Sequence, residues 1–537
     1  MKKLKYILIA AAAMVAAVAC TKNFEDRNTN PEEATDEMLG WDNLRVGSAF
    51  AQMTRNVIPS YQLIGTEEYG SANFQVVQDL TGNLFANYIG VVNTGFTANN
   101  IYNITSKAWY EAMFNDAYVR ATGSWETLDL YREESPEAAA LGDILKVALM
   151  HRVTDTYGPV PYLQIGSGLV TLQYDSQEVI YNSFFEELDA AINTLTSFWQ
   201  AQPGTKILAD YDNVFGGDLA KWIKFANTLR MRLAMRVVYA DKALAMAQAE
   251  AALSNPVGLM ASAADLAALR KPASGAWENP LYVIQYSFND DRIGATIEAY
   301  MNGFNDPRLP KYFTAGADGG YHGVRNGISL TSDYANSALL SKMNCTNNDD
   351  LLWMNPAEAW FLKAEYWLRN GDKAQARQCY EEGVKVSFDV CGVSGAEDYL
   401  SDAKSVPAKY VDVVNGGNSY NSSLSDITPA WNDAADFEKN LEQIITQKYI
   451  AGFPEGQEAW SEFRRTGYPN VIPYSVNQSG GKIDTKRQIR RLNWPSTEYR
   501  TNAANVSAAI STLNGESSLG TGDNGGTRLW WDKNTRF

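Results

Sequence analysis

Apolar residues recur at three- and four-residue spacing over long stretches of the chain, which is the pattern of amphipathic helices. The clearest stretch covers residues 136–153, where Pro136 occupies a favourable first helical position. Its apolar stripe consists of Leu141, Ile144, Leu145, Ala148 and Leu149. The same spacing returns over residues 178–198, 218–239 and 241–253. The pattern therefore predicts a mainly α protein.

Residues 355–388 predict two helices joined by a short turn. Asn355 is a potential helix cap, and Glu358 stands at the capping-box position three residues later. Gly371 ends the first helix, and Asp372 begins the second. The length of this unit and its small residues resemble a tetratricopeptide hairpin. A generic helical hairpin has the same pattern, so both interpretations stay open.

Long segments rich in Gly, Asn and Ser separate the helices. They cover residues 65–103, 272–291, 316–348 and 395–428. Few strands are expected, for example at residues 207–208. Long loops on a rigid scaffold usually carry the binding residues. We therefore expect residues 37–537 to form a single large domain in which helix hairpins support long irregular loops.

The N-terminus has the layout of an export signal, with three lysines in the first five residues and an apolar run over residues 6–19. That run is too short for a transmembrane helix. Small residues precede Cys20, as in the lipobox of lipoproteins, which predicts removal of residues 1–19 and acylation of Cys20. The alternative is an ordinary secretory signal that contains a cysteine. Residues 20–36 are polar and acidic, which predicts a flexible tether.

Composition restricts the possible ligands. The net charge of −16 argues against nucleic acid, because phosphate binding needs clustered Lys and Arg. The chain contains 29 Tyr and 14 Trp, and such amphipathic rings stack on sugars or hold peptides. Many of these rings must simply belong to the core.

Catalytic and metal motifs are missing from the sequence. The chain has two histidines, and neither His151 nor His322 stands near a GxSxG or cysteine nucleophile motif. After Cys20, the cysteines Cys345, Cys379 and Cys391 form no CxxC pair, so neither zinc spacing nor a disulfide framework is predicted. A Cys379–Cys391 bridge is an alternative to unpaired thiols. We predict no catalytic residue, no metal and no cofactor, although paired carboxylates cannot be located by spacing alone.

Seven segments occur in order along most of the chain and together resemble one family. They are HRVTDTYGPVPY (151–162), KWIKFANTLRMRLAMR (221–236), NDPRL (305–309), NPAEAWFLKAEYWLRNG (355–371), QKYIAGFPEGQEAWSEFRRTGYP (447–469), RRLNWPSTEYRTNAANV (490–506) and RLWWD (528–532). The set is similar to the SusD/RagB family of nutrient-binding outer-membrane lipoproteins.

This resemblance implies four tetratricopeptide-like helix pairs and a lipid-anchored position on the outer membrane, facing the cell exterior. It also implies a partner, a SusC-like TonB-dependent outer-membrane barrel that the lipoprotein covers as a lid. The implied ligand is an oligosaccharide, or a peptide in the RagB branch, and no catalysis is expected. A surface glycoside hydrolase and a purely structural lid are the alternatives.

Two of these motifs favour structural roles. Asp155 follows a buried-type helix and precedes a Gly/Pro turn, so it is expected to accept bonds from nearby loop amides. Arg464 and Arg465 stand beside aromatic residues, which predicts guanidinium groups paired with carboxylates or stacked on rings.

Ligand contacts are predicted from aromatic and amide residues in the Gly/Asn-rich loops, because rings stack on sugar faces while amides bond to hydroxyls. The residues are Tyr69, Asn83 and Tyr88 in the first loop, and Trp277, Asn279 and Tyr282 in the second. Further candidates in the same loops are Asn73, Phe74, Phe96, Asn99, Asn100 and Tyr286. Tyr88 and Trp277 are the foremost candidates. Each has loop packing as its alternative role.

The lipobox generates a direct prediction. Cys20→Ser should move the protein from the membrane fraction to the soluble fraction, because each buried acyl methylene contributes about 0.8 kcal/mol of membrane binding. Cell fractionation and mass spectrometry of the mature N-terminus measure this. Cys379→Ser, the matched control, should stay in the membrane fraction, and an unmodified Cys20 in the mature protein would contradict the prediction.

Overall fold

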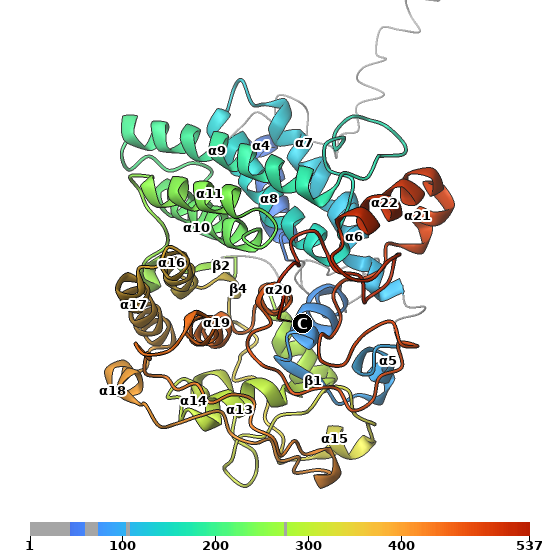
Figure 1. Ribbon diagram of the computed structural model, residues 1–537. Helices are drawn as coiled ribbons and strands as arrows, with labels where there is room; N and C mark the ends of the chain where they lie inside the picture. Colours follow the sequence, from blue (N-terminus) through green and yellow to red (C-terminus); the bar gives the residue numbers. More distant parts are fainter. Residues whose placement is uncertain (1–42, 59–72, 104–107, 273–276, 537) are drawn as a thin grey trace, which may run out of the picture. The chain divides into compact units, whose positions relative to one another are not determined.

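The structure is a computed structural model that describes residues 43–58, 73–103, 108–272 and 277–536 (Figure 1). The chain divides after Ser48, and the account below concerns the unit that starts at Ala49. The predicted signal, the tether, Cys20 and Tyr69 lie outside the described residues. Across the described ranges, no helix has the length and apolarity needed to span a bilayer.

Helix pairs dominate the fold, as the periodicity predicts (Figure 1). They are α8 (Pro136–Tyr157) with α9 (Gln177–Ala201), α10 (Leu219–Arg236) with α11 (Lys242–Ser254), and α16 (Ala357–Arg369) with α17 (Lys373–Cys391). Side-chain caps begin two of these helices: the carboxylates of Asp218 and Asp241 accept the amides of Lys221 and Leu244 at 3.2 and 2.9 Å. The mainly α prediction is confirmed.

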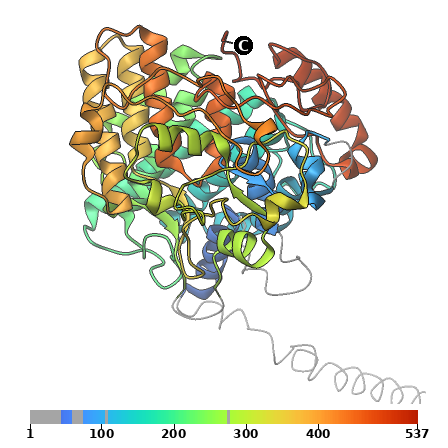
Figure 2. The same ribbon diagram turned by 90° about the horizontal axis from the view of Figure 1, so that it is seen from below.

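Two central helices join these pairs together. Helix α19 (Phe437–Gly452) packs against α16 and α17, which stand beside it in Figure 2. Helix α20 (Gly456–Thr466) packs against the π-helix η4 (Gln75–Asn83). Helix α10 contacts both α9 and α16, so the pairs form one continuous helical scaffold. The tetratricopeptide character of residues 355–388 stays a prediction.

Shorter elements fill the connections. The α-helices are α4 (Leu44–Asn56), α5 (Thr97–Asn100), α6 (Ala112–Asp116), α7 (Thr122–Leu130), α12 (Pro280–Tyr282), α13 (Ala295–Gly303), α14 (Leu309–Tyr312), α15 (Ser332–Asn336), α18 (Ala396–Ser401), α21 (Ser496–Thr501) and α22 (Ala503–Glu516). The 3-10 helices are η5 (Thr94–Phe96), η6 (Ala108–Glu111), η8 (Ala263–Asp265) and η10 (Gly416–Asn418), and the other π-helices are η7 (Ala117–Ala121) and η9 (Val283–Phe288).

The strands form two antiparallel pairs. Strand β1 (Ile89–Val91) pairs with β3 (Asp291–Ile293), and β2 (Ala267–Leu269) pairs with β4 (Leu351–Met354). The prediction of a strand at residues 207–208 is wrong. The Ile207 amide does bond to the Gly217 carbonyl at 3.2 Å, but Leu208 has φ of 53°, which no extended strand allows.

The prediction that Glu358 closes a capping box is also wrong. The two carboxylate oxygens of Glu358 instead accept the Arg232 guanidinium of α10 at 2.7 and 2.6 Å. Asn355 does act at the start of the helix, since its side-chain oxygen accepts the Ala357 amide at 3.0 Å. A long-range ion pair has therefore replaced a local cap.

That ion pair belongs to a set of buried charges, here called the interior ion network. Its members are Arg152, Asp155, Arg232, Arg236, Glu358, Glu365, Arg369, Lys448, Glu455, Glu458, Glu462 and Arg465. Arg465 holds Glu365 through two bonds of 2.6 Å, and Glu458 receives Arg236 at 2.5 Å and Lys448 at 2.9 Å. Helices α8, α10, α16, α19 and α20 are tied together by this network.

Two further predictions concern the arginine pair and Asp155. Arg465 is paired with carboxylates, and the Arg464 guanidinium lies 3.5 Å from the Trp460 ring centroid, as expected. Asp155 has a structural role, but its partners differ from the prediction. They are the Tyr181 hydroxyl at 2.6 Å and the Trp531 indole at 2.8 Å instead of loop amides.

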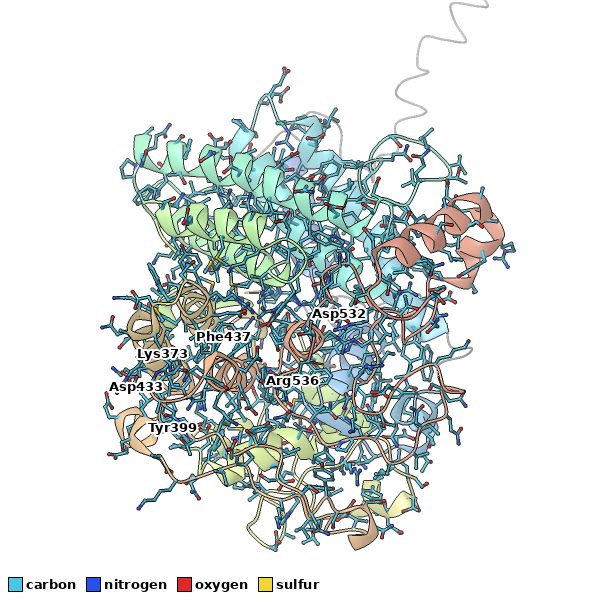
Figure 3. All side chains as sticks on the ribbon, viewed as in Figure 1. Lys373, Tyr399, Asp433, Phe437, Asp532 and Arg536 are labelled. Atoms are coloured by element: carbon cyan, nitrogen blue, oxygen red, sulfur yellow. The ribbon has the colours of Figure 1, made fainter. Side chains whose placement is uncertain are left out.

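The C-terminal segment is locked to α20 through charged groups. Asp532, labelled in Figure 3, accepts two bonds of 2.7 Å from Arg490. Arg490 in turn donates to the Arg464 carbonyl at 2.5 Å. The three cysteines Cys345, Cys379 and Cys391 are free thiols, so the Cys379–Cys391 bridge is not formed.

The network generates a stability prediction. Glu365→Gln leaves Arg465 and Arg369 short of one buried countercharge, so we expect a loss of about 3–5 kcal/mol in the free energy of unfolding. Burial alone raises the pKa of Glu365, but Arg465 and Arg369 outweigh it and lower that pKa to about 2. The stabilisation is therefore complete at neutral pH and is lost as the pH falls towards 2.

Urea unfolding followed by tryptophan fluorescence, at pH 7 and at acidic pH, measures this difference. Arg377→Met is the control, because Arg377 forms exposed pairs with Glu381 and Asp433 and should change stability by less than about 0.5 kcal/mol. Equal stabilities of wild type and Glu365→Gln at pH 7 would contradict the prediction.

Candidate ligand-binding surface

Two of the predicted binding loops lie side by side. The first contains the π-helix η4 and runs on into β1, and the second contains α12 and the π-helix η9 before β3. Pairing of β1 with β3 sets Ile89 opposite Ile293 and Val91 opposite Asp291. π-Helices are uncommon and are frequently found at functional sites. Sequence periodicity gave no sign of either one.

Asp290 cross-links the two loops. Its side chain accepts the Gln75 amide of η4 at 2.7 Å and the Asn93 amide at 2.6 Å, while its carbonyl accepts the Val92 amide at 2.8 Å. Close backbone approach adds to this, because a Cβ at Gly294 would lie 2.1 Å from the Asn87 carbonyl oxygen. The loops therefore form one fixed unit.

Two half-buried tyrosines on the second loop form what we call the tyrosine ledge, Tyr282 and Tyr286. Their rings are stacked, with centroids 4.9 Å apart and planes 19° apart. Tyr286 is fixed, since its hydroxyl donates to the Met343 carbonyl at 2.7 Å and the Lys342 ammonium lies 4.8 Å from its ring. Among the described residues the Tyr282 hydroxyl has no hydrogen-bond partner, which leaves it able to bond to a ligand.

A second pair of rings lies on the first loop and the helix after it. Phe96 in η5 and Trp109 in η6 have centroids 5.5 Å apart and a tilt of 59°, and Trp109 is 38% exposed. Asn93 precedes Phe96 by three residues, and its side chain donates to Asp290. Asp290 follows Phe288 by two residues, and Phe288 is 37% exposed. The Phe96–Trp109 pair and the tyrosine ledge thus extend from two neighbouring loops.

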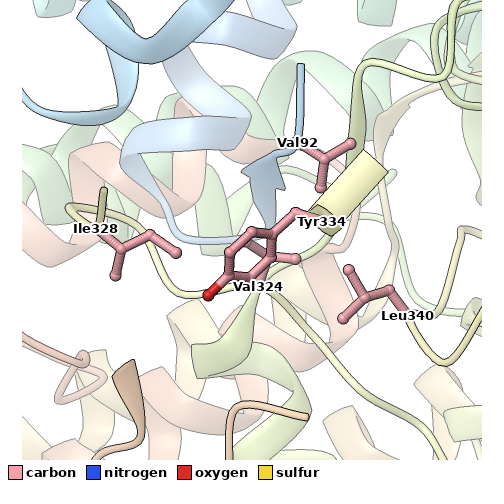
Figure 4. Close-up of a cluster of buried hydrophobic side chains, with 5 residues drawn as sticks. All are labelled: Val92, Val324, Ile328, Tyr334 and Leu340. Atoms are coloured by element: carbon pink, nitrogen blue, oxygen red, sulfur yellow. The ribbon is translucent and has the colours of Figure 1, made fainter. Parts of the chain in front are cut away.

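A small hydrophobic cluster supports the third loop (316–348) beside these two. It consists of Val92, Val324, Ile328, Tyr334 and Leu340 (Figure 4). Val92 comes directly after β1, so the cluster attaches this loop to the strand pair. The same loop carries Lys342 and Met343, the partners of Tyr286. The position of the ledge is therefore set by packing on both sides.

Asn83 and Tyr88, predicted as ligand contacts, are completely buried. The Asn83 side chain donates to Asp79 at 2.9 Å and accepts the Gly456 amide at 3.1 Å. The Tyr88 hydroxyl donates to the Tyr449 carbonyl at 2.5 Å. Both side chains connect the first loop to helices α19 and α20, so in this structure they act as framework and offer no surface to solvent.

Trp277 and Asn279 are also largely enclosed, at 8% and 2% exposed. The Trp277 indole donates to the Asp349 carbonyl at 3.1 Å. The Asn279 oxygen accepts the amides of Leu281 and Tyr282 and so caps the helix that carries the ledge. Asn279 therefore fixes the backbone of Tyr282, and both Trp277 and Asn279 attach this segment to the Asp349 carbonyl.

Trp109 was not among the ligand contacts predicted from the sequence. It follows the Asn-rich end of the first loop, but its exposure depends on packing that the sequence does not encode locally. Tyr286 was a further candidate in the second loop, and it stands four residues after Tyr282, a spacing that places two rings on one face of a helical turn.

The histidines occupy unrelated positions. His151 is buried in α8, its ring bonds to the Val147 carbonyl at 3.0 Å, and burial together with Arg232 and Arg152 lowers its pKa well below the usual value. His322 lies 2.9 Å from Asp318 in the third loop. Over the described residues, no group of three or more His, Cys, Asp or Glu side chains is suited to a metal ion.

Two other spaces in the molecule are less suited to stacking. An open cleft of about 590 Å³ lies at the start of α19, but one face of its aromatic residue, Tyr468, is covered by Arg536 at 3.8 Å. An internal cavity of about 20 Å³ beside Tyr88 and Lys448 has room for about one water molecule. The ledge and the Phe96–Trp109 pair offer the more favourable stacking surface.

Comparison with known proteins agrees with the resemblance found in the sequence. A family model described as SusD-like, SusD and RagB outer membrane lipoprotein, matches residues 26–532. No functionally curated protein matches the chain.

Solved structures are similar over nearly the whole chain. A chitin-binding SusD homologue from Flavobacterium johnsoniae is 36% identical with a TM-score of 0.83, covering 91% of this chain and 98% of its own. A SusD homologue from Bacteroides uniformis is 36% identical with a TM-score of 0.83, covering 92% and 100%. Another from Bacteroides thetaiotaomicron is 36% identical with a TM-score of 0.81, covering 91% and 99%.

Proposed function

Because the chain belongs to the SusD-like family of SusD and RagB outer membrane lipoproteins, we propose that it captures oligosaccharides at the cell surface. The observation that carries this proposal is the tyrosine ledge, a fixed and partly exposed stacked pair whose Tyr282 hydroxyl has no hydrogen-bond partner in the part of the chain that the structure describes. Aromatic stacking contributes about 0.5–1.5 kcal/mol beyond area burial. Several such contacts on a shallow surface would give modest affinity, which suits capture followed by release.

Of the residues predicted from the sequence, Tyr282 is the one we propose as a direct contact. Trp277 and Asn279 would act on the ligand mainly through Tyr282, because their polar atoms bond to the Asp349 backbone and to the start of α12. Tyr69, which lies outside the described residues, stays a proposed contact. The Phe96–Trp109 pair would extend the surface for a longer chain of sugars.

The proposal includes no chemical step on the ligand. Its rival is a surface glycoside hydrolase, which product release from labelled glycans would reveal. A peptide receptor of the RagB kind would instead yield protein that co-purifies with peptides.

Delivery requires a partner and an anchor. We propose a SusC-like TonB-dependent barrel as the partner and acylated Cys20 as the anchor, with the binding surface on the cell exterior. The family description, outer membrane lipoprotein, supports the anchor. Co-purification with the barrel from detergent-solubilised outer membranes tests the partnership.

The ledge generates a binding prediction. Tyr282→Ala and Trp109→Ala should each weaken binding about tenfold, because each removes one stacking face worth about 1.4 kcal/mol. Chitooligosaccharides are the first probe, since one similar structure is that of a chitin-binding protein. A glycan array followed by calorimetry on the strongest hit covers other sugars.

Tyr499→Ala is the matched control, because Tyr499 is a 42% exposed tyrosine on α21 that belongs to neither aromatic pair. It should bind as the wild type does. Unchanged affinity of both ring variants for a glycan that the wild type binds would remove the ledge as the site.

A further inference from the structure

Two buried carboxyl groups meet beneath the tyrosine ledge. They belong to Asp79 of η4 and Asp291 of β3, both with 0% exposure. One oxygen of Asp79 accepts the Asn83 amide at 2.9 Å, and one oxygen of Asp291 accepts the Gln285 amide at 2.5 Å. Among the described residues the other oxygen of each carboxyl, Oδ2, receives no hydrogen-bond donor, and the two carboxyls lie close enough to interact directly with each other.

Such a contact requires a proton, because two ionised carboxylates have no donor between them. Burial raises the pKa of Asp79 to about 6, opposed by its bonds to Asp291 and Asn83. Burial and then the charge of Asp79 raise the pKa of Asp291 well above its usual range. At neutral pH the pair therefore retains one proton.

A continuous series of hydrogen bonds leads from this pair to the ledge. Gln285, in η9 between the two ledge tyrosines, donates to Asp291 and accepts the Met343 amide at 2.6 Å. The Met343 carbonyl accepts the Tyr286 hydroxyl at 2.7 Å. Lys342, which lies over the Tyr286 ring, donates to the Gln285 carbonyl at 2.9 Å. Every step uses a group that is fixed by a second partner.

We propose that Asp79 and Asp291 are positioning residues that hold the tyrosine ledge through Gln285 and Met343, and that the ledge loosens when their shared proton is lost. Without that proton, two adjacent negative charges in a buried site repel, which separates η4 from β3. The effect on ligand affinity rests on the proposed function, whereas the effect on the order of the ledge does not.

Other charged groups near the pair do not replace the proton. Asp290 adds negative charge, although its oxygens are occupied by Gln75 and Asn93. Arg292 opposes the rise at Asp291, but its guanidinium bonds to the carbonyls of Asp291 and Ala335 and to Asn289.

Lys342 and Cys345 approach from the third loop and interact more weakly with Asp291. On the side of α20, Glu455 is neutralised by Arg152. None of these groups donates to the free Oδ2 atoms, which stay without another partner.

The direction of the pH effect follows from the raised pKa values. The proton that the pair shares leaves at the higher of the two pKa values, that of Asp291, which is raised well above its usual range. The stability that this proton contributes is therefore present in acidic and neutral solution and is lost as the pH rises through that pKa. The ledge should be more ordered in acidic and neutral solution than in alkaline solution.

The test compares the full-length wild type with Asp79→Asn, in which an amide donor replaces the shared proton. Hydrogen–deuterium exchange of peptides covering residues 282–293, corrected for the intrinsic rate, is measured at about pH 5.5 and 8.5 without ligand. Protection in the wild type should fall about tenfold at the higher pH, and protection in Asp79→Asn should stay constant.

Glu516→Gln is the matched control. Glu516 is a half-buried acid on α22 whose pKa is raised to about 7 chiefly by burial, and it accepts the Glu178 amide. Its substitution should alter the pH dependence of global stability and leave the exchange of residues 282–293 as in the wild type. If Asp79→Asn does not fold, the infrared band of a protonated buried carboxyl in wild type and Asp291→Asn provides the same comparison.

The possible results separate the two proposals. Exchange that is independent of pH in the wild type, or equally dependent in Asp79→Asn, would overturn the positioning role. The expected exchange pattern in a protein that binds no glycan would support the positioning role and reject the proposed function. Where a chitooligosaccharide binds, its affinity should fall with rising pH in the wild type and stay level in Asp79→Asn, and the opposite trend would overturn the inference.

Discussion

Full pairing of the interior charges is the constraint on which the rest of this structure depends. Arg465 with Glu365, and Arg236 with Glu458, are removed from water, so each partner is tolerable only while the other is in place. Geometry of this kind permits one register between neighbouring helices, since a slip of one residue would leave a bare charge inside. The helical scaffold is therefore specified by electrostatics as well as by apolar packing.

A short series of contacts connects this scaffold to the proposed binding surface. Helix α20 supplies three members of the network and packs on η4 so closely that a Cβ at Gly82 would lie 2.7 Å from the Gln457 amide nitrogen. From η4, Asp79 meets Asp291, and β3 continues the second loop with its two tyrosines. Irregular loops thus acquire a defined shape because each is attached to a rigid neighbour at more than one point.

Local sequence signals predicted what local interactions decide. The long helices follow from periodicity, and the aromatic and carboxylate partners of Arg464 and Arg465 follow from the residues around them. What failed depends on partners far along the chain. Glu358 binds an arginine 126 residues away, and the burial of Tyr88 reflects a contact 361 residues away. For the candidate site, the sequence identified the second loop. Which of its rings faces outward depends on the third loop, whose Met343 and Lys342 fix Tyr286.

The stacking of Tyr282 on the fixed Tyr286 has a consequence for how readily a ligand would bind and leave. A platform that is already rigid loses little conformational freedom when a ligand arrives, so few contacts are needed for useful occupancy. The same small number of contacts means a low barrier to departure. Brief residence suits the capture and release that we propose, and a rigid shallow shelf would provide it.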